Sequence, residues 1–176
     1  MKGKGLIHVY YGYGKGKTTC ALGLAVRASG RGFKVVIVQF LKDMNTGELK
    51  QFEKMDGVKV IRGTAAPRFV KDMTPEEVEE TRRMQNDHLK QAMDFVRAGE
   101  CDLLILDEAL DAYQNGVLDE DLLRDAICNK PADLELVITG HKPTDWIFDE
   151  ADYITEMRKE RHPFDKGIRA RKGIEL

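Results

Sequence analysis

The sequence feature that most constrains the fold is a glycine-rich segment near the start of the chain. It reads Gly-Tyr-Gly-Lys-Gly-Lys-Thr-Thr over residues 12–19. The usual phosphate-binding loop has a glycine, four residues and then Gly-Lys-Ser/Thr. Counted back from Gly16, the first glycine belongs at position 11, where Tyr11 stands, and Gly12 comes one place late. The segment therefore keeps the phosphate-binding residues but has a loop that is one residue short.

The sequence on either side of this loop favours a strand before it and a helix after it. Residues 5–10 are apolar and partly β-branched, as in a buried parallel strand, and residues 18–29 carry alanines and leucines at helical spacing. In that setting the loop N–H groups converge on an anion, Lys17 reaches phosphate oxygens and Thr18 can bind Mg²⁺. The alternative is a glycine-rich turn that only connects the strand to the helix. The predicted nucleotide-binding residues of the loop are Gly12, Tyr13, Gly14, Lys15, Gly16, Lys17, Thr18 and Thr19.

Length and composition exclude several other classes of protein. The 176 residues suit a single domain over residues 1–176. The formal net charge of −2 gives no overall attraction to nucleic acid or to a membrane, and the apolar runs are too short to span a bilayer. Because the N-terminus leads directly into the first predicted strand, we expect no signal peptide and a cytoplasmic protein. Cys20, Cys101 and Cys128 lack metal-ligand spacing, and we expect them to be buried, reduced thiols.

Strand-like and helix-like segments alternate along the rest of the chain. The predicted strands are 34–40, 58–61, 103–108, 134–139 and 153–156, and the predicted helices are 45–55, 74–98, 119–128 and 145–150. Such alternation indicates a parallel sheet covered on both faces, with ligands beyond the carboxyl ends of its strands. The sequence therefore predicts an α/β architecture, a three-layer P-loop NTPase fold of the RecA-like type, with a mostly parallel central sheet flanked by helices.

A second strong signal is the acidic pair Asp107 and Glu108, which ends the apolar run 103–106. A strand that ends in this way is the usual partner of a phosphate-binding loop, because one carboxylate helps to hold the Mg²⁺ ion. We therefore predict metal ligands at Thr18, Asp107 and Glu108. The alternative is an acidic N-cap for the segment that follows, a role that Asp111 can share.

Three further features each leave two interpretations open. His141 follows the fifth strand, where it either contacts phosphate or metal or is a solvated loop residue. Arg27 either reaches a phosphate or ends its helix favourably against the helix dipole. Residues 158–172 carry seven Lys or Arg against two acidic residues. This basic segment is either a solvated surface or a tail that folds back to meet a polyanion.

Five segments in the same order resemble the P-loop type of ATP:corrinoid adenosyltransferase, the cob(I)yrinic acid a,c-diamide adenosyltransferases. They are the loop at 12–19, Val-Gln-Phe-Leu-Lys at 38–42, Leu-Asp-Glu at 106–108, Ile-Thr-Gly at 138–140 and His-Pro-Phe-Asp-Lys-Gly-Ile-Arg-Ala-Arg-Lys-Gly-Ile at 162–174. The shortened loop and the last segment are the specific ones. The resemblance covers nearly the whole chain.

The resemblance implies that ATP binds in reversed orientation, with its triphosphate held by residues 12–19 and Arg27 and its 5′ carbon exposed. A cobalt(I) corrinoid attacks that carbon, and the products are an adenosylated corrinoid and inorganic triphosphate. Cobalt(I) carries no proton, so the reaction needs no general base, and its polyanionic leaving group is stabilised by cations and N–H donors. The implied catalytic residues are Lys17, Thr18 and Glu108, with Mg²⁺ (or Mn²⁺) as the metal.

By the same resemblance, residues 63–73 line the corrinoid site, and Phe69, Lys71 and His141 are the predicted corrinoid-binding residues. The resemblance also implies a homodimer and an electron donor that reduces the cobalt. The chain departs from the family pattern at three points. Tyr13 replaces a small polar residue, the segment from Phe69 to Lys71 lacks the tryptophan of Phe-x-Trp, and the amino-terminal segment is short.

Two other functions are compatible with the motifs. In an ATPase or phosphotransferase, Glu108 orients a water or hydroxyl at the γ-phosphate, but a shortened loop argues against reaction at that phosphate. The second alternative is a non-catalytic nucleotide-binding module whose basic tail contacts nucleic acid. Such a module would bind nucleic acid with a steep salt dependence, and the near-neutral net charge argues against this function.

Overall fold

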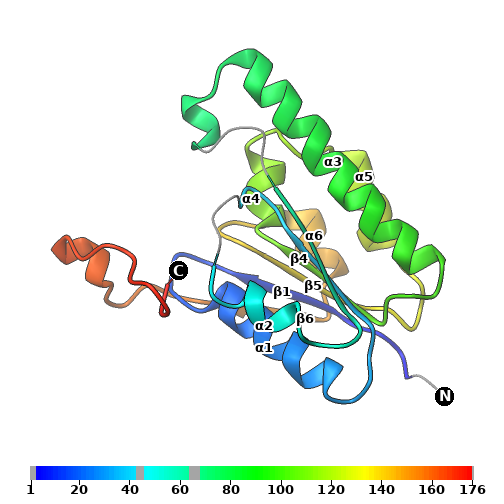
Figure 1. The fold of residues 1–176 in the computed structure, drawn as a ribbon. Coiled ribbons are helices and arrows are strands. Elements are labelled where there is room, and N and C mark those ends of the chain that lie inside the picture. The colour runs from blue at the N-terminus through cyan, green and yellow to red at the C-terminus, as the bar shows by residue number, and fades with distance from the viewer. Residues whose placement is uncertain (1–2, 43–45, 64–67, 176) are drawn as a thin grey trace.

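The computed structural model describes residues 3–42, 46–63 and 68–175. Its centre is a six-stranded sheet in the order β3-β2-β4-β5-β1-β6, and all its pairings are parallel (Figure 1). The strands are β1 (Ile7–Tyr11), β2 (Val35–Gln39), β3 (Val58–Arg62), β4 (Leu103–Asp107), β5 (Glu135–Gly140) and β6 (Tyr153–Glu156). The predicted α/β fold with a parallel sheet is confirmed.

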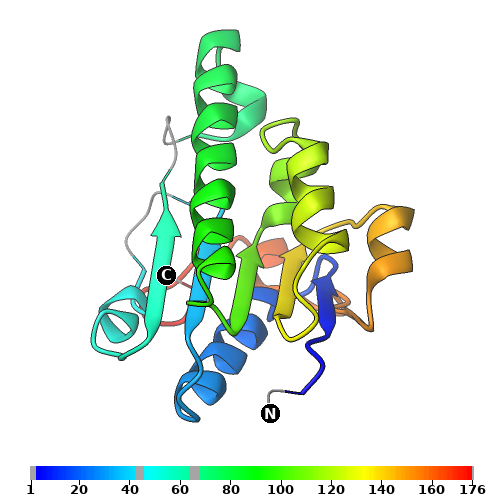
Figure 2. The ribbon, with the colours of Figure 1, turned by 90° about the vertical axis from the view of Figure 1, so that its right-hand side faces the viewer.

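Helices cover both faces of this sheet, because alternate residues of each central strand point to opposite sides. Val36 and Val38 of β2 pack into one hydrophobic core, whereas Val35 and Ile37 pack into the other. The first core lies under α3, α4, α5 and α6, and the second lies under α1 and α2 (Figures 1 and 2). The helices are α1 (Lys17–Ser29), α2 (Leu49–Phe52), α3 (Pro75–Arg97), α4 (Ala109–Gln114), α5 (Glu120–Cys128) and α6 (Asp145–Glu150).

The start of α3 illustrates how the sequence sets these elements. The Thr74 hydroxyl accepts a hydrogen bond from the Glu77 N–H at 3.3 Å, and the Glu77 carboxylate accepts one from the Thr74 N–H at 2.8 Å. Pro75 occupies the first turn, where no N–H donor is needed. This reciprocal cap is the one that the sequence predicts.

The structure also corrects the predicted local structure. The helix predicted over 45–55 is reduced to α2, which has four residues, and position 45 lies outside the described residues. The short helix α4, directly after the acidic pair, is absent from the sequence-based prediction. Two short 3₁₀ turns, Val70–Asp72 and Pro163–Lys166, interrupt the segments before α3 and near the C-terminus.

The prediction that the three cysteines are buried is wrong for two of them. Cys101 is buried, but Cys20 and Cys128 are exposed, and the three cysteines form no disulfide with one another. Cys20 lies in the first turns of α1, next to the buried Ala21, and Cys128 is the last residue of α5. Neither cysteine belongs to the buried face of its helix, and the Cys20 thiol lies at the edge of that face, within hydrogen-bonding reach of the Tyr10 side chain of β1.

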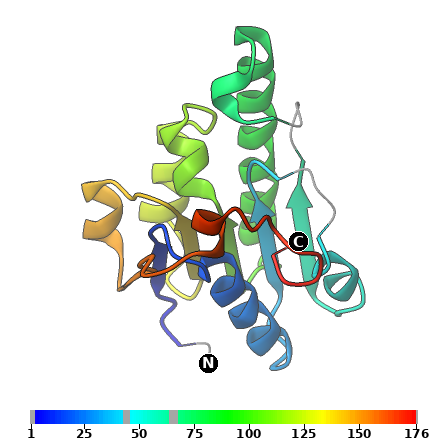
Figure 3. The ribbon, with the colours of Figure 1, turned by 90° about the vertical axis from the view of Figure 1, so that its left-hand side faces the viewer.

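The carboxyl ends of β1, β4 and β5 meet at one edge of the sheet, as parallel pairing requires. Tyr11 pairs with Gly140, and Gln39 pairs with Asp107. The chain beyond β6, drawn in orange to red, turns back past the start of α1 (Figure 3). Among the described residues, no helix is both long enough and apolar enough to cross a membrane.

Candidate nucleotide-binding site

The shortened loop connects β1 to α1 and is fixed at both of its first glycines. The Gly12 N–H donates to the carbonyl oxygens of Gly140 and His141, at 3.2 and 3.0 Å. The Gly14 N–H donates to the Met157 carbonyl oxygen at 2.6 Å. The loop therefore rests on the end of β5 and on the chain that leaves β6.

Glycine is required at these positions because the loop approaches this neighbouring backbone so closely. A Cβ atom on Gly14 would lie 2.6 Å from the carbonyl oxygens of both Met157 and Arg158. A Cβ on Gly12 would lie 2.6 Å from the Met157 oxygen, and its φ of 110° also disfavours any other residue. Gly16 has a φ of 123° and forms the N-cap of α1. The contact with residues 157–158 thus requires glycine at positions 12 and 14, and the positive φ favours it at position 16.

Lys17 folds back over this loop. Its ammonium donates to the carbonyl oxygens of Gly12 at 2.6 Å and of Gly14 at 3.1 Å. Burial lowers the pKa of the Lys17 ammonium, although the carboxylates of Asp111 and Glu108 oppose that effect. The ammonium is therefore held beside the loop, where phosphate oxygens can replace the two carbonyl oxygens.

Thr18 and Asp107 are joined directly, although they lie on different elements. The Thr18 hydroxyl donates to Asp107 Oδ1 at 2.9 Å, and the Thr139 hydroxyl donates to the same oxygen at 2.7 Å. Asp107 is fully buried at the end of β4. Glu108 has a left-handed backbone with a φ of 63°, and its N–H donates to the Thr139 hydroxyl at 2.9 Å. The carboxyl ends of β4 and β5 thus fix the two acidic residues beside the loop.

The alternative role of Glu108 as an acidic cap is not supported by its contacts. Glu108 occupies the N-cap position of α4, but its side chain makes no capping hydrogen bond. Burial raises the pKa of Glu108, although the Lys42 ammonium opposes this shift. Asp111 instead accepts hydrogen bonds from the backbone N–H and the Nδ1 of His141, at 3.1 and 2.8 Å. Asp111 therefore orients His141.

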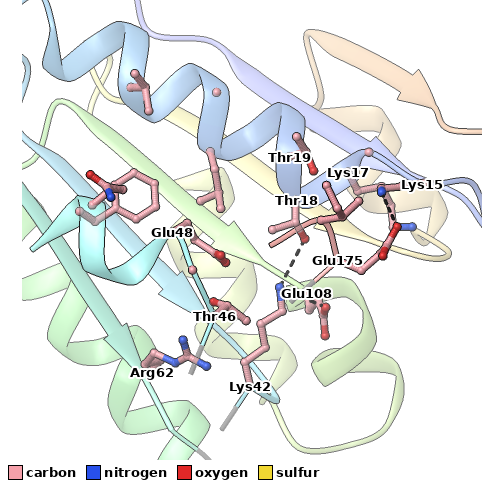
Figure 4. A pocket seen from close by; sticks show the side chains of 18 of the residues that line it. Lys15, Lys17, Thr18, Thr19, Lys42, Thr46, Glu48, Arg62, Glu108 and Glu175 are labelled. Atoms are coloured by element: carbon pink, nitrogen blue, oxygen red, sulfur yellow. Dashed lines mark hydrogen bonds and ion pairs between the residues drawn. The ribbon is translucent and has the colours of Figure 1, made fainter. Parts of the chain in front are cut away.

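Lys42 is a site residue to which the sequence analysis assigns no role. Its Nζ lies 2.6 Å from Asp107 Oδ2, 3.3 Å from Glu108 Oε1 and 3.4 Å from the Thr18 hydroxyl. Figure 4 shows the Lys42 side chain beside Thr18 and Glu108. Burial alone would lower the pKa of the Lys42 ammonium, but the two carboxylates outweigh it and the pKa is raised. The preceding Leu41 has a φ of 58°, so the chain turns sharply as it leaves β2. The sequence feature that could have identified Lys42 is its position just after the buried strand predicted over 34–40.

These residues border a pocket of about 920 Å³ that extends from the loop along α1 toward α2. Eight of the predicted site residues line it, namely Gly14, Lys15, Gly16, Lys17, Thr18, Thr19, Glu108 and His141. Its other end combines the apolar side chains of Leu22, Val26, Phe52 and Met55 with the polar Thr46, Glu48, Gln51 and Arg62. Gly173, Ile174 and Glu175 from the C-terminal segment complete the wall.

The remaining predicted residues do not line this pocket. Gly12 and Asp107 accept hydrogen bonds from the pocket residues Lys17 and Thr18, and the exposed Tyr13 ring packs against His141 with 5.2 Å between ring centroids. Arg27 lies in the last turn of α1. Phe69 and Lys71 lie together before α3, with the Lys71 ammonium 5.7 Å from the centre of the exposed Phe69 ring. Their neighbours at 64–67 lie outside the described residues.

The arrangement defines the class of the protein. A glycine-rich loop between β1 and α1, an acidic strand end bonded to the loop threonine and a parallel sheet are together typical of P-loop nucleotide-binding proteins. Among the described residues, His, Cys, Asp and Glu side chains do not gather in groups of three that could hold a metal ion. Oxygen ligands for Mg²⁺ in such sites come partly from the nucleotide and from water, so two or three protein oxygens suffice.

Comparisons with known proteins give the family within this class. A model of the family "ATP:corrinoid adenosyltransferase BtuR/CobO/CobP" matches residues 3–176. The chain is 32% identical to the corrinoid adenosyltransferase of Pseudomonas aeruginosa over 190 residues, covering 98% of this chain and 84% of the relative. It is 31% identical to the corrinoid adenosyltransferase of Escherichia coli K12 and to CobA of Salmonella typhimurium, covering 98% of this chain and 86% of each relative. The chain therefore belongs to the ATP:corrinoid adenosyltransferase family, and the resemblance seen in its sequence is confirmed.

Proposed function

We propose that the protein transfers the 5′-deoxyadenosyl group of ATP to the cobalt(I) of a corrinoid and releases triphosphate. Besides membership of the family, one observation supports this most directly: the pocket presents the Lys15 and Lys17 ammonium groups at the loop and the apolar side chains of Leu22, Val26, Phe52 and Met55 between α1 and α2. The cationic end suits a triphosphate, and the apolar end suits the flat face of adenine. The ribose 5′ carbon then lies between the two ends.

The transfer forms one bond and breaks one. The cobalt(I) electron pair forms the bond to the 5′ carbon, while the bond from that carbon to the triphosphate oxygen breaks and leaves its electrons on triphosphate. No proton moves, so the site needs groups that stabilise a departing polyanion and needs no base. Lys17 and Lys15 from the loop are such groups, and both line the pocket. The predicted catalytic role of Lys17 is therefore to stabilise the leaving triphosphate.

The predicted metal site fits a hard divalent cation. The oxygens of Thr18, Asp107 and Glu108 already surround a cation, because the Lys42 ammonium lies within 3.4 Å of all three. Hydroxyl and carboxylate oxygens are the ligands that Mg²⁺ and Mn²⁺ prefer. We propose that Thr18 and Glu108 hold the metal and that the buried Asp107 orients Thr18. When bound, the metal neutralises charge on the phosphates.

The corrinoid side of the site includes Phe69, Lys71 and His141 in our proposal. The Phe69 ring is 76% exposed, so its apolar face is open to a flat ligand. The Lys71 ammonium beside it adds a cation that can contact the carboxamide or carboxylate groups at the rim of a corrin ring. The electron donor, the homodimer, the cytoplasmic location and the organisation of residues 1–176 as one domain remain predictions.

The decisive experiment incubates the protein with magnesium–ATP and a chemically reduced cobalt(I) corrinoid. We expect the absorption spectrum of a cobalt–carbon bond to appear, with one triphosphate released for each bond formed. The Lys17→Ala variant should lose this activity, whereas Lys90→Ala, an exposed change on α3, should retain it. Release of ADP or orthophosphate without triphosphate would instead indicate reaction at the γ-phosphate.

A further inference from the structure

The C-terminal segment reaches the phosphate end of the pocket, although it is far from the loop in sequence. After β6, the chain passes the loop at residues 157–158, turns through the 3₁₀ segment Pro163–Lys166 and returns (Figure 3). Residues 173–175 then form part of the pocket wall. Of the two interpretations of the basic tail, the structure favours the one in which the tail folds back toward the nucleotide site.

The contact that the tail makes there is anionic. Glu175 Oε1 lies 2.8 Å from the Lys15 ammonium of the loop (Figure 4). The same carboxylate accepts hydrogen bonds from Arg171 Nη2 at 2.9 Å, from Arg171 Nε at 3.1 Å and from the Arg171 backbone N–H at 2.9 Å. Glu175 keeps a quarter of its side chain exposed, and Lys15 and Arg171 keep about half. One carboxylate thus pairs with two cations beside the phosphate-binding loop.

These groups match what a phosphate would meet at the same place. Two cations and a backbone N–H converge on the carboxylate oxygens, and phosphate oxygens accept hydrogen bonds from the same donors. Hydrogen bonds from Arg171 and Lys15 hold the pKa of Glu175 well below its usual range, so it remains an anion at neutral pH. A triphosphate carries several negative charges against the single charge of Glu175, and it is therefore the stronger ligand for both cations.

We propose that Glu175 occupies part of the triphosphate subsite in the nucleotide-free protein, and that Lys15 and Arg171 become ligands of the triphosphate when it displaces this carboxylate. The inference rests on the proposed function for the identity of the anion. It assigns the C-terminal segment two opposite effects. Glu175 weakens polyphosphate binding by competing for the cations, and Arg171 strengthens it by direct contact.

The two effects are separable by measuring the binding of inorganic triphosphate to the full chain by titration calorimetry. Exposed ion pairs contribute about 0.2–1 kcal/mol each, which corresponds to at most about a fivefold change in affinity per pair. Since Glu175→Gln releases two cations, we expect triphosphate to bind about 3- to 10-fold more tightly to this variant. Arg171→Gln, introduced into the Glu175→Gln protein, should weaken binding again by about 3- to 10-fold. Glu160→Gln changes a more exposed carboxylate in the same segment and should leave binding unchanged.

Each outcome bears on a different part of the proposal. If Glu175→Gln binds triphosphate no more tightly than the unchanged protein, the carboxylate does not compete and the proposal is wrong. If Arg171→Gln has no effect in the Glu175→Gln background, Arg171 only anchors the tail and its role as a phosphate ligand is refuted. Lys17→Ala, measured in parallel, tests the site itself. If Lys17→Ala binds triphosphate as tightly as the unchanged protein, triphosphate binds elsewhere and the proposed function fails. If Lys17→Ala loses binding while the Glu175 and Arg171 variants behave like the unchanged protein, only the proposed role of the tail is refuted.

Discussion

Replacing Lys42 with methionine tests whether its ammonium takes the place of a metal ion in the nucleotide-free protein. The Lys42 ammonium lies 2.6 Å from Asp107 and 3.3 Å from Glu108. Methionine has a similar length and no charge, so Lys42→Met removes the cation and retains most of the packing. The Asp107 and Glu108 carboxylates then lie close together without the Lys42 cation, and Asp107 is fully buried.

The magnitude of the effect follows from the burial of these groups. Removing one partner of a buried ion pair costs about 3–5 kcal/mol, because the other charge remains in a medium of low dielectric constant. The Lys42 side chain keeps 21% of its surface exposed and that of Glu108 keeps 34%, so we take the lower end, about 3 kcal/mol. For a chain of this size, each kcal/mol lowers the melting temperature by about 2–4 °C. We therefore expect Lys42→Met to unfold about 6–12 °C below the unchanged protein in a chelating buffer.

The assay is thermal unfolding with a chelator and with millimolar Mg²⁺, in the absence of nucleotide. Mg²⁺ should raise the melting temperature of Lys42→Met more than that of the unchanged protein, because the ion no longer competes with the ammonium. Lys90→Met is the matched control, since Lys90 forms an exposed ion pair with Asp87 at 3.4 Å, and such pairs contribute little. The argument is refuted if Lys42→Met and the unchanged protein melt at the same temperature in chelator. It is also refuted if Mg²⁺ raises the melting temperatures of these two proteins equally.

Three other changes probe other parts of the structure. Gly14→Ala places a Cβ atom 2.6 Å from two backbone carbonyl oxygens, so the loop must move. We expect ATP binding measured by calorimetry to be at least about tenfold weaker. Unchanged ATP binding would show that the loop shifts freely and that the close contact is not required. Burial lowers the pKa of His88, so the unfolded chain takes up a proton at a higher pH than the native state does. The free energy of unfolding is therefore highest above about pH 6.5 and decreases as the pH falls below that value. In denaturant unfolding between about pH 5 and 7, the free energy of unfolding should fall less steeply with pH for His88→Gln than for the unchanged protein. An equal pH dependence in the two proteins would contradict the assignment to His88. Phe69→Ala should raise the KM for the corrinoid several-fold while the KM for ATP and the melting temperature stay constant, because the ring is exposed; a parallel rise in both KM values would place the corrinoid elsewhere.

The parts of the fold that follow from local sequence were predictable. The central strands β2 and β4 are apolar except for their last residues because both of their faces are buried, and they are fully buried along their length. The cap of α3 was predictable because Thr74 and Glu77 satisfy each other within one turn. The glycine loop was predictable because its spacing is local as well.

The parts that depend on contacts between distant segments were not predictable. Helix α4 has only six residues and follows a left-handed Glu108, so no helical periodicity identifies it. Lys42 reaches the acidic pair across 65 positions of sequence, and Glu175 reaches Lys15 across 160. In both cases the residue type is common on protein surfaces, and only the folded chain shows that it lies in the site.

The contact between the loop and the end of β6 links the short loop to the role we propose for the tail. In an ordinary phosphate-binding loop, backbone N–H groups hold the phosphates. Here the Gly14 N–H donates to the Met157 carbonyl oxygen at 2.6 Å, so this donor is already used within the protein. In the proposed function, side-chain cations therefore hold more of the triphosphate, and Lys15, Lys17 and Arg171 are the cations proposed for this role. Such cations suit a leaving group that departs whole, because they stabilise the charge on the entire triphosphate rather than on its terminal phosphate alone.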